Sequence, residues 1–337
     1  MGKESKRGDA VKKICAFSSD SRELYKADIY RAMSFPEGHI LHFRYKPKYV
    51  DSNLLAKVAS LQGACAAIFY THGNVDGQPG THVSVREATI GKIEVSPDTD
   101  LVHVYFRLGK FCNLRLDSAN ATEKLPPTLF LSELDCTVVG GNDNWQGRVT
   151  ALAPHFPPIT FINIRNVRQK EHHVALQYSD SNRACHYRIE HGSRYVLSIS
   201  LGNPLSTGNG VEVNESSGNV SINAIKPLET SAQFDDLEIP LIAKRLQDAS
   251  YPSLLTFSPK SGSGIMSEYV VNLEVELRSS VAPAIWFGFA TVVAVASLGV
   301  SQPRSAAATW PSLPVLLLAA LLLWSSTSFL YYWFNKK

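Results

Sequence analysis

The sequence has few cysteines, and they are widely spaced. Its 337 residues include five of them: Cys15, Cys65, Cys112, Cys136 and Cys185. The count is odd and no two form a C-x-x-C pair, which argues against both a structural zinc site and a complete disulfide framework. We therefore expect free thiols in a reducing compartment and no metal site.

Catalytic signatures are also missing. The chain contains no H-E-x-x-H motif, no G-x-S-x-G nucleophile elbow and no Walker A loop. Although ten histidines are present, the adjacent His172 and His173 would point to opposite faces of a strand, so their spacing does not predict chelation. We predict no catalytic residue and no cofactor. An enzyme whose site is assembled across several strands stays open as an alternative.

Acidic residues are absent from the end of the chain, because residues 281–337 contain no Asp or Glu. Within this region, residues 281–300 and 313–330 are uncharged and apolar. A run of about twenty apolar residues forms a helix long enough to cross the hydrocarbon core of a bilayer. The short, turn-rich connection between the two runs predicts an antiparallel transmembrane hairpin over 281–334.

Charge predicts the orientation of this hairpin. Arg278, Lys336 and Lys337 fall on one side of it and Arg304 on the other, and the amino terminus has no signal-peptide core. The positive-inside rule then places both termini and the preceding domains in the cytosol, as an integral membrane protein with the lipid bilayer as a partner. Small residues at four-residue spacing favour packing of the membrane helices into a homo-oligomer; they are Ala284, Gly288, Ala290 and Ala294.

Alternation of apolar and polar residues dominates the region before the hairpin. In "HILHFRY", for example, Leu41, Phe43 and Tyr45 share one face, as in a half-buried strand. The fold class we predict is mostly β, with two β-barrel or β-sandwich domains, the second antiparallel and immunoglobulin-like, followed by the hairpin. The predicted boundaries are 1–145 for a basic β-rich domain with one short helix near 50–61, and 157–279 for the sandwich.

The clearest polar cluster is "HFRYKPKYV". If the strand continues toward Pro47, then Arg44, Lys46 and Lys48 share one face, while Tyr45 and Tyr49 share the other. Such a stripe suits nucleotide phosphates, nucleic acid or anionic lipid headgroups. The alternative is an ordinary strand edge protected by its positive charge against pairing with other strands. We predict that these five residues bind an anionic ligand.

Three functions fit these observations. The first is a membrane-anchored cytosolic protein that senses or binds an anionic small molecule, a lipid headgroup or a protein partner. The second is a sensor-effector whose hairpins oligomerise to perturb the membrane, and the third is the enzyme mentioned above. In layout alone, β-domains joined to two apolar carboxy-terminal segments resemble the membrane-associated effectors of some bacterial anti-phage systems.

Overall fold

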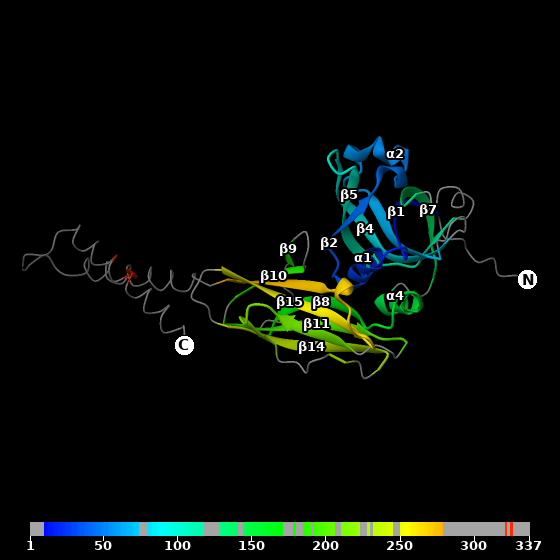
Figure 1. Cartoon of the computed structure of the whole chain (residues 1–337). Helices are drawn as coiled ribbons and strands as arrows, with labels where there is room; N and C mark the ends of the chain where they lie inside the picture. The colour runs from blue at the N-terminus through cyan, green and yellow to red at the C-terminus, as the bar shows by residue number, and fades with distance from the viewer. Residues whose placement is uncertain are drawn as a thin grey trace, which may run out of the picture.

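The computed structural model describes most of residues 10–278. The described ranges are 10–73, 80–117, 129–140, 144–170, 178–179, 185–190, 192–205, 210–222, 228–229, 232–244 and 250–278, together with Leu321, Trp324 and Ser325. Within them the chain is mostly β, with one sheet before residue 139 and two sheets after residue 160 (Figure 1).

The first sheet has seven strands in the order β2-β5-β4-β3-β1-β7-β6. Their bounds are β1 Val11–Ser19, β2 Ile40–Tyr45, β3 Cys65–His72, β4 Thr81–Ser96, β5 Leu101–Phe111, β6 Leu114–Leu116 and β7 Leu131–Val138. Strands β1 and β3 pair in parallel, whereas the other neighbours pair antiparallel. A parallel pair needs a long crossover, and the chain from residue 20 to 64 supplies it.

The chain segment after β2 brings the two ends of this sheet toward each other. Val50 forms an isolated parallel bridge with Leu131 at the start of β7. Two backbone hydrogen bonds flank that bridge, from Phe130 N–H to Tyr49 O at 2.7 Å and from Asp51 N–H to Leu131 O at 2.9 Å. The sheet is therefore curled, and β2 and β1 approach each other without being paired strands.

Helix α1 (Glu23–Ser34) is the longest described helix, with 12 residues. It contains no Gly or Pro, and the ion pair between Asp28 and Arg31 joins consecutive turns. It ends at Phe35, which is extended because Pro36 follows. The fully buried guanidinium of Arg86 donates to the carbonyls of Ala32 and Phe35 at 3.0 and 2.6 Å, which places a cation at the negative end of the helix.

The remaining helices are short. They are η1 Pro47–Tyr49, α2 Ser52–Leu55, η2 Val58–Ser60, α4 Trp145–Leu152, η3 Ala153–His155 and η4 Ser267–Tyr269. The helix predicted near 50–61 is thus divided into α2 and η2. Asp51 is the N-cap of α2, since its carboxylate accepts a hydrogen bond from Asn53 N–H at 2.9 Å.

Two sheets form the second half of the described chain. One has the order β13-β14-β11-β8 and the other has the order β12-β15-β17-β10-β9, with β16 paired to β15. The bounds are β8 Phe161–Gln169, β9 Tyr178–Ser179, β10 Cys185–Glu190, β11 Arg194–Gly202, β12 Val211–Glu215, β13 Val220–Ile222, β14 Phe234–Ala243, β15 Ser250–Ser261, β16 Gly264–Ile265 and β17 Val271–Arg278. The sheets lie as two layers (Figure 1). The predicted all-antiparallel pairing is wrong at β10 and β17, which run parallel.

Helix α1 lies between the first sheet and these two layers (Figure 1). The Tyr30 hydroxyl donates to Thr160 O at 2.9 Å, and the Tyr269 hydroxyl donates to the Glu23 carboxylate at 2.5 Å. Asn163 and Trp145 both donate to Met33 O, at 2.9 and 3.0 Å. Since α1 is buried on both sides, the hydrophobic core runs continuously from the first sheet into the second half.

The predicted transmembrane hairpin is corrected by the structure. No helix in the described ranges is both long and apolar enough to cross a bilayer. Residues 281–300 lie outside the described residues, as do all but Leu321, Trp324 and Ser325 of 313–330. The helix-packing residues Ala284, Gly288, Ala290 and Ala294 also lie outside them.

The physical basis of that prediction is the length of two uncharged runs, which indicates apolar composition and does not by itself establish a helix. Within the described ranges, the fold class is mostly β and includes no membrane-spanning helix. The predictions of a two-pass membrane protein and of a cytosolic orientation at the bilayer are wrong.

Candidate functional site

A cavity of about 390 Å³ lies between the end of β1, the start of α1 and the turn after β2. It is lined by Phe17, Ser18, Ser19, Ser21, Arg22, Leu24, Tyr25, Asp28, Phe43, Arg44, Tyr45, Lys46, Tyr49, Leu101 and Phe130. Four of the five predicted ligand-binding residues are among them. We call this space the aromatic cavity, because six of its lining residues carry aromatic rings.

The local sequence explains the shape of the turn after β2. Lys46 is extended, as expected before proline, and Pro47 opens the 3-10 turn η1 because it has no N–H to continue the strand. Lys48 therefore does not continue the strand face of Arg44 and Lys46, contrary to the prediction. Its ammonium lies 4.9 Å from the centroid of the Tyr49 ring, and Lys48 is absent from the cavity lining.

Three cations stand at the rim of the aromatic cavity. Arg44 and Lys46 come from the β2 side and Arg22 from the residue before α1, and all three are exposed. The sequence pattern identified the first two and missed Arg22. Alternation reveals only residues that share a strand, whereas Arg22 reaches the site through the crossover that contains α1.

The aromatic rings form a floor and a rim. Phe17, Phe43 and Tyr45 are buried, and the Tyr45 hydroxyl donates to Phe17 O at 3.4 Å, which links β2 to β1. The rim rings are only partly buried, and two of them, Tyr49 and Phe130, pack edge to face with centroids 5.3 Å apart. Tyr25 on α1 is the third partly buried ring. The cavity thus offers apolar ring surface beneath a positively charged opening.

Serine side chains fix the loop from β1 to α1 in place. The Ser18 hydroxyl donates to Tyr25 O at 3.0 Å, and the Ser19 and Ser21 hydroxyls are hydrogen bonded at 2.7 Å. Asp20 accepts a hydrogen bond from Gly73 N–H at 2.9 Å. These contacts hold the start of α1, and with it this wall of the cavity, against the sheet.

Asp28 is the carboxylate in the aromatic cavity. Its Oδ1 atom lies 3.1 Å from Arg31 Nη1, and 23% of its side chain is exposed. Burial raises the pKa of Asp28 to about 6, although the charges of Arg31 and Arg44 act in the opposite direction. The site therefore contains one acid whose charge changes just below neutral pH.

A second cavity of about 380 Å³ lies on the same β unit. It is lined by Lys12, Lys13, Ile14, Asp51, Asn53, Leu54, Lys57, Leu61, Ala64, Cys65 and Glu133. No aromatic ring belongs to this lining. We call it the lysine cavity.

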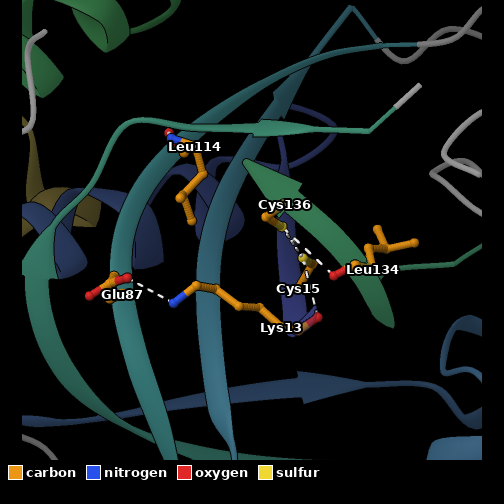
Figure 2. A network of polar contacts seen from close by, with 7 residues as sticks. Lys13, Cys15, Glu87, Leu114, Leu134 and Cys136 are labelled. Atoms are coloured by element: carbon orange, nitrogen blue, oxygen red, sulfur yellow. Dashed lines mark hydrogen bonds and ion pairs between the residues drawn. The ribbon is translucent and has the colours of Figure 1, made fainter. Parts of the chain in front are cut away.

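Cys15 and Cys136 belong to a network of polar contacts with Lys13 and Glu87 (Figure 2). Lys13 Nζ contacts Glu87 Oε1 at 2.7 Å, and the sulfurs of Cys15 and Cys136 lie 3.5 Å apart. The hydrogen bond with Cys136 and burial both raise the pKa of Cys15, and burial raises the pKa of Cys112 to about 12. Cys15 and Cys112 are therefore packed and protonated at neutral pH, whereas the hydrogen bond with Cys15 lowers the pKa of Cys136.

The described ranges contain no candidate metal site. Within them, no group of three or more His, Cys, Asp and Glu side chains is arranged to hold a metal ion. His172 and His173, considered from the sequence, lie outside the described residues.

Comparisons with known proteins do not identify the chain. No family model matches it, and no curated protein matches it. Among solved structures, the VesB protease of Vibrio cholerae matches at 11% identity over 72% of this chain and 96% of its own, with a TM-score of 0.19. The sialic acid binding region of the Streptococcus sanguinis SK1 adhesin matches at 9% identity over 83% and 80%, with a TM-score of 0.21. At these TM-scores the likeness carries no argument about fold or function.

Proposed function

We propose that this chain is a binding protein whose ligand is anionic and occupies the aromatic cavity. The observation that carries the proposal is the meeting of Arg22, Arg44 and Lys46 at the opening of one cavity. Arg22 precedes a helix, whereas Arg44 and Lys46 lie at the end of a strand more than twenty positions later. The fold therefore brings distant cations together into one positively charged site.

The cavity has the size and composition of a ligand site. Its volume of about 390 Å³ lies within the range of about 300–1,000 Å³ that is usual for small-molecule pockets. Such pockets combine apolar and aromatic walls with a few charged groups that fix the orientation of the ligand. Exposed cations on an ordinary protective strand edge need no such cavity beneath them.

Isothermal titration of the full chain with inorganic pyrophosphate and ribose 5-phosphate tests the proposal. The charge reversal Arg44→Glu with Lys46→Glu is expected to weaken binding by about tenfold or more. The matched control, Lys12→Glu with Lys57→Glu, makes the same change of charge in the lysine cavity and is expected to stay within about twofold of the unmodified protein.

Two results would contradict the proposal. One is that neither inorganic pyrophosphate nor ribose 5-phosphate binds at low ionic strength. The other is an equal loss of affinity in the double variant and in its control, because this would mean that overall charge, rather than the aromatic cavity, attracts the anion.

A further inference from the structure

The aromatic cavity also indicates the class of its ligand. Resting on the function proposed above, we propose that the anion is a nucleotide, bound with its base among the aromatic rings and its phosphate among the rim cations. Three observations support this assignment: the number of rings, the position of the cations and the presence of a carboxylate.

The rings provide surface that a small inorganic anion would not use. Phe17 and Phe43 are 1% and 3% exposed, and their rings offer phosphate oxygens no hydrogen bonds. Tyr25, Tyr49 and Phe130 are only partly buried and present ring surface at the rim. Each nucleobase has a flat π-face, and aromatic side chains are the usual surfaces on which bases stack.

The cations are confined to the rim. Arg44 and Lys46 are exposed, so they meet a ligand group that remains in contact with water. Arg44 offers a planar fork of donors that matches two phosphate oxygens, and Lys46 offers a mobile point charge. A ligand that fits both rim and floor carries its charge at one end and an aromatic ring at the other.

Asp28 distinguishes a nucleotide from a simple organic phosphate. A carboxylate in an anion site repels the bound charge, so its presence indicates a ligand that also brings hydrogen-bond donors. Arg31 contacts one of the two carboxylate oxygens, and each of these oxygens can accept more than one hydrogen bond. The amino groups of adenine, cytosine and guanine are donors that a carboxylate accepts.

Titration of the full chain with four nucleoside monophosphates, AMP, CMP, GMP and UMP, tests this inference. Ribose 5-phosphate serves as the same phosphate without a base, and glycerol 3-phosphate represents a lipid headgroup. We expect at least one nucleotide to bind about tenfold or more tightly than ribose 5-phosphate, because stacking adds to the phosphate contacts.

Three variants separate the contribution of the base. Tyr49→Ala is expected to reduce nucleotide affinity to that of ribose 5-phosphate and to leave ribose 5-phosphate binding within about twofold, whereas Tyr49→Phe keeps the stacking ring and the affinity. Asp28→Asn is expected to narrow the preference for bases with an amino group over uracil, since it replaces a charged acceptor with a neutral amide.

The outcomes distinguish the two proposals. If the nucleotides, ribose 5-phosphate and glycerol 3-phosphate bind equally, and binding still depends on Arg44 and Lys46, then anion binding stands and the nucleotide assignment is overturned. Tighter binding of glycerol 3-phosphate than of every nucleotide would likewise overturn it in favour of a headgroup. If none of the probes binds, the proposed function fails as well.

Discussion

The first β unit contains two cavities that are nearly equal in volume and different in character. The aromatic cavity measures about 390 Å³ and the lysine cavity about 380 Å³. Each has three basic residues in its lining, Arg22, Arg44 and Lys46 in the first and Lys12, Lys13 and Lys57 in the second. The two cavities therefore have nearly the same volume and the same number of basic residues. Their difference in character must come from the other lining residues.

Two features make the lysine cavity a weaker candidate. Lys13 is already engaged with Glu87 at 2.7 Å, and Asp51 and Glu133 add two acids to the lining. Six rings line the aromatic cavity and none belongs to the lining of the other. The comparison teaches that the two cavities differ in the apolar ring surface beneath the charge, a feature usual in small-molecule pockets, and not in the charge itself.

The largest expected difference between the cavities is in their contribution to stability. Phe17→Ala removes a floor ring that is 1% exposed and stacks on Phe69 at 5.3 Å, so we expect a loss of about 3–5 kcal/mol in the free energy of unfolding. Leu61→Ala in the lysine cavity, where the side chain is 8% exposed, is expected to cost less, about 2 kcal/mol. Urea denaturation measures both, and equal losses would contradict the view that the floor belongs to the core.

The acid of the aromatic cavity, Asp28, should make the stability of the protein depend on pH. The pKa of Asp28 is raised by burial to about 6, so the folded state holds this proton more tightly than the unfolded chain. Its contribution to stability is present at low pH and is lost as the pH rises from about 4 to about 6, by roughly 2 kcal/mol. Asp28→Asn should flatten this part of the pH dependence of the free energy of unfolding.

Asp51, in the lining of the lysine cavity, contributes to stability through hydrogen bonds. Its carboxylate caps α2 and also accepts a hydrogen bond from the Ser132 hydroxyl at 3.3 Å. Asp51→Ala is therefore expected to destabilise the protein by about 1 kcal/mol at neutral pH through the loss of the cap.

Urea denaturation at several pH values measures both variants. If the free energy of unfolding of Asp28→Asn depends on pH in the same way as that of the unmodified protein, the assigned role of Asp28 is refuted.

Chemical labelling of cysteine should modify a residue that lines the lysine cavity and none that lines the aromatic cavity. Cys65 is exposed there, whereas Cys15, Cys112, Cys136 and Cys185 are buried. N-ethylmaleimide is expected to modify Cys65 about tenfold faster than any of the buried thiols. Peptide mass mapping checks the selectivity, with Cys65→Ser as the control.

After this modification, the affinity for the best-bound nucleotide should change by less than about twofold. A larger loss that Cys65→Ser prevents would place the ligand in the lysine cavity.

The smallest expected effect concerns Lys48. Its ammonium lies over the Tyr49 ring and not in the cavity lining, so Lys48→Ala should weaken ligand binding by less than about threefold, against the much larger loss expected for Lys46→Ala. Titration calorimetry on the two single variants makes the comparison directly. Equal losses of affinity would indicate that Lys48 binds the ligand together with Arg44 and Lys46, as the sequence pattern predicts.

Part of this site is predictable from the sequence because strand alternation is a local property. Leu41, Phe43 and Tyr45 are buried as the alternation predicts, and Arg44 between them is exposed. Pro47 ends the strand, which explains why Lys48 departs from the predicted face. Arg22 could not be found in this way, because only the crossover through α1 brings it to the cavity.

Helix α1 and the carboxy-terminal region show two further limits of sequence patterns. Ala27, Ile29, Tyr30, Ala32 and Met33 are all buried, so residues 23–34 lack the one-sided apolar stripe by which a surface helix is recognised. Residues 281–330 show the other limit: their apolar composition predicts two spanning helices, but composition alone does not establish that a run is helical, and no spanning helix lies within the described ranges.

Helix α1 also determines how this protein can be altered by recombination. Its two faces are covered by different halves of the chain, through Tyr30 on Thr160 and Arg86 on Ala32 and Phe35. A chimaera that exchanges the second half for a foreign domain would leave the Tyr30 hydroxyl and the apolar side chains beside it facing water or an unmatched surface. The two halves therefore cannot be shuffled as independent modules, and compatible replacements must supply the surface that α1 requires.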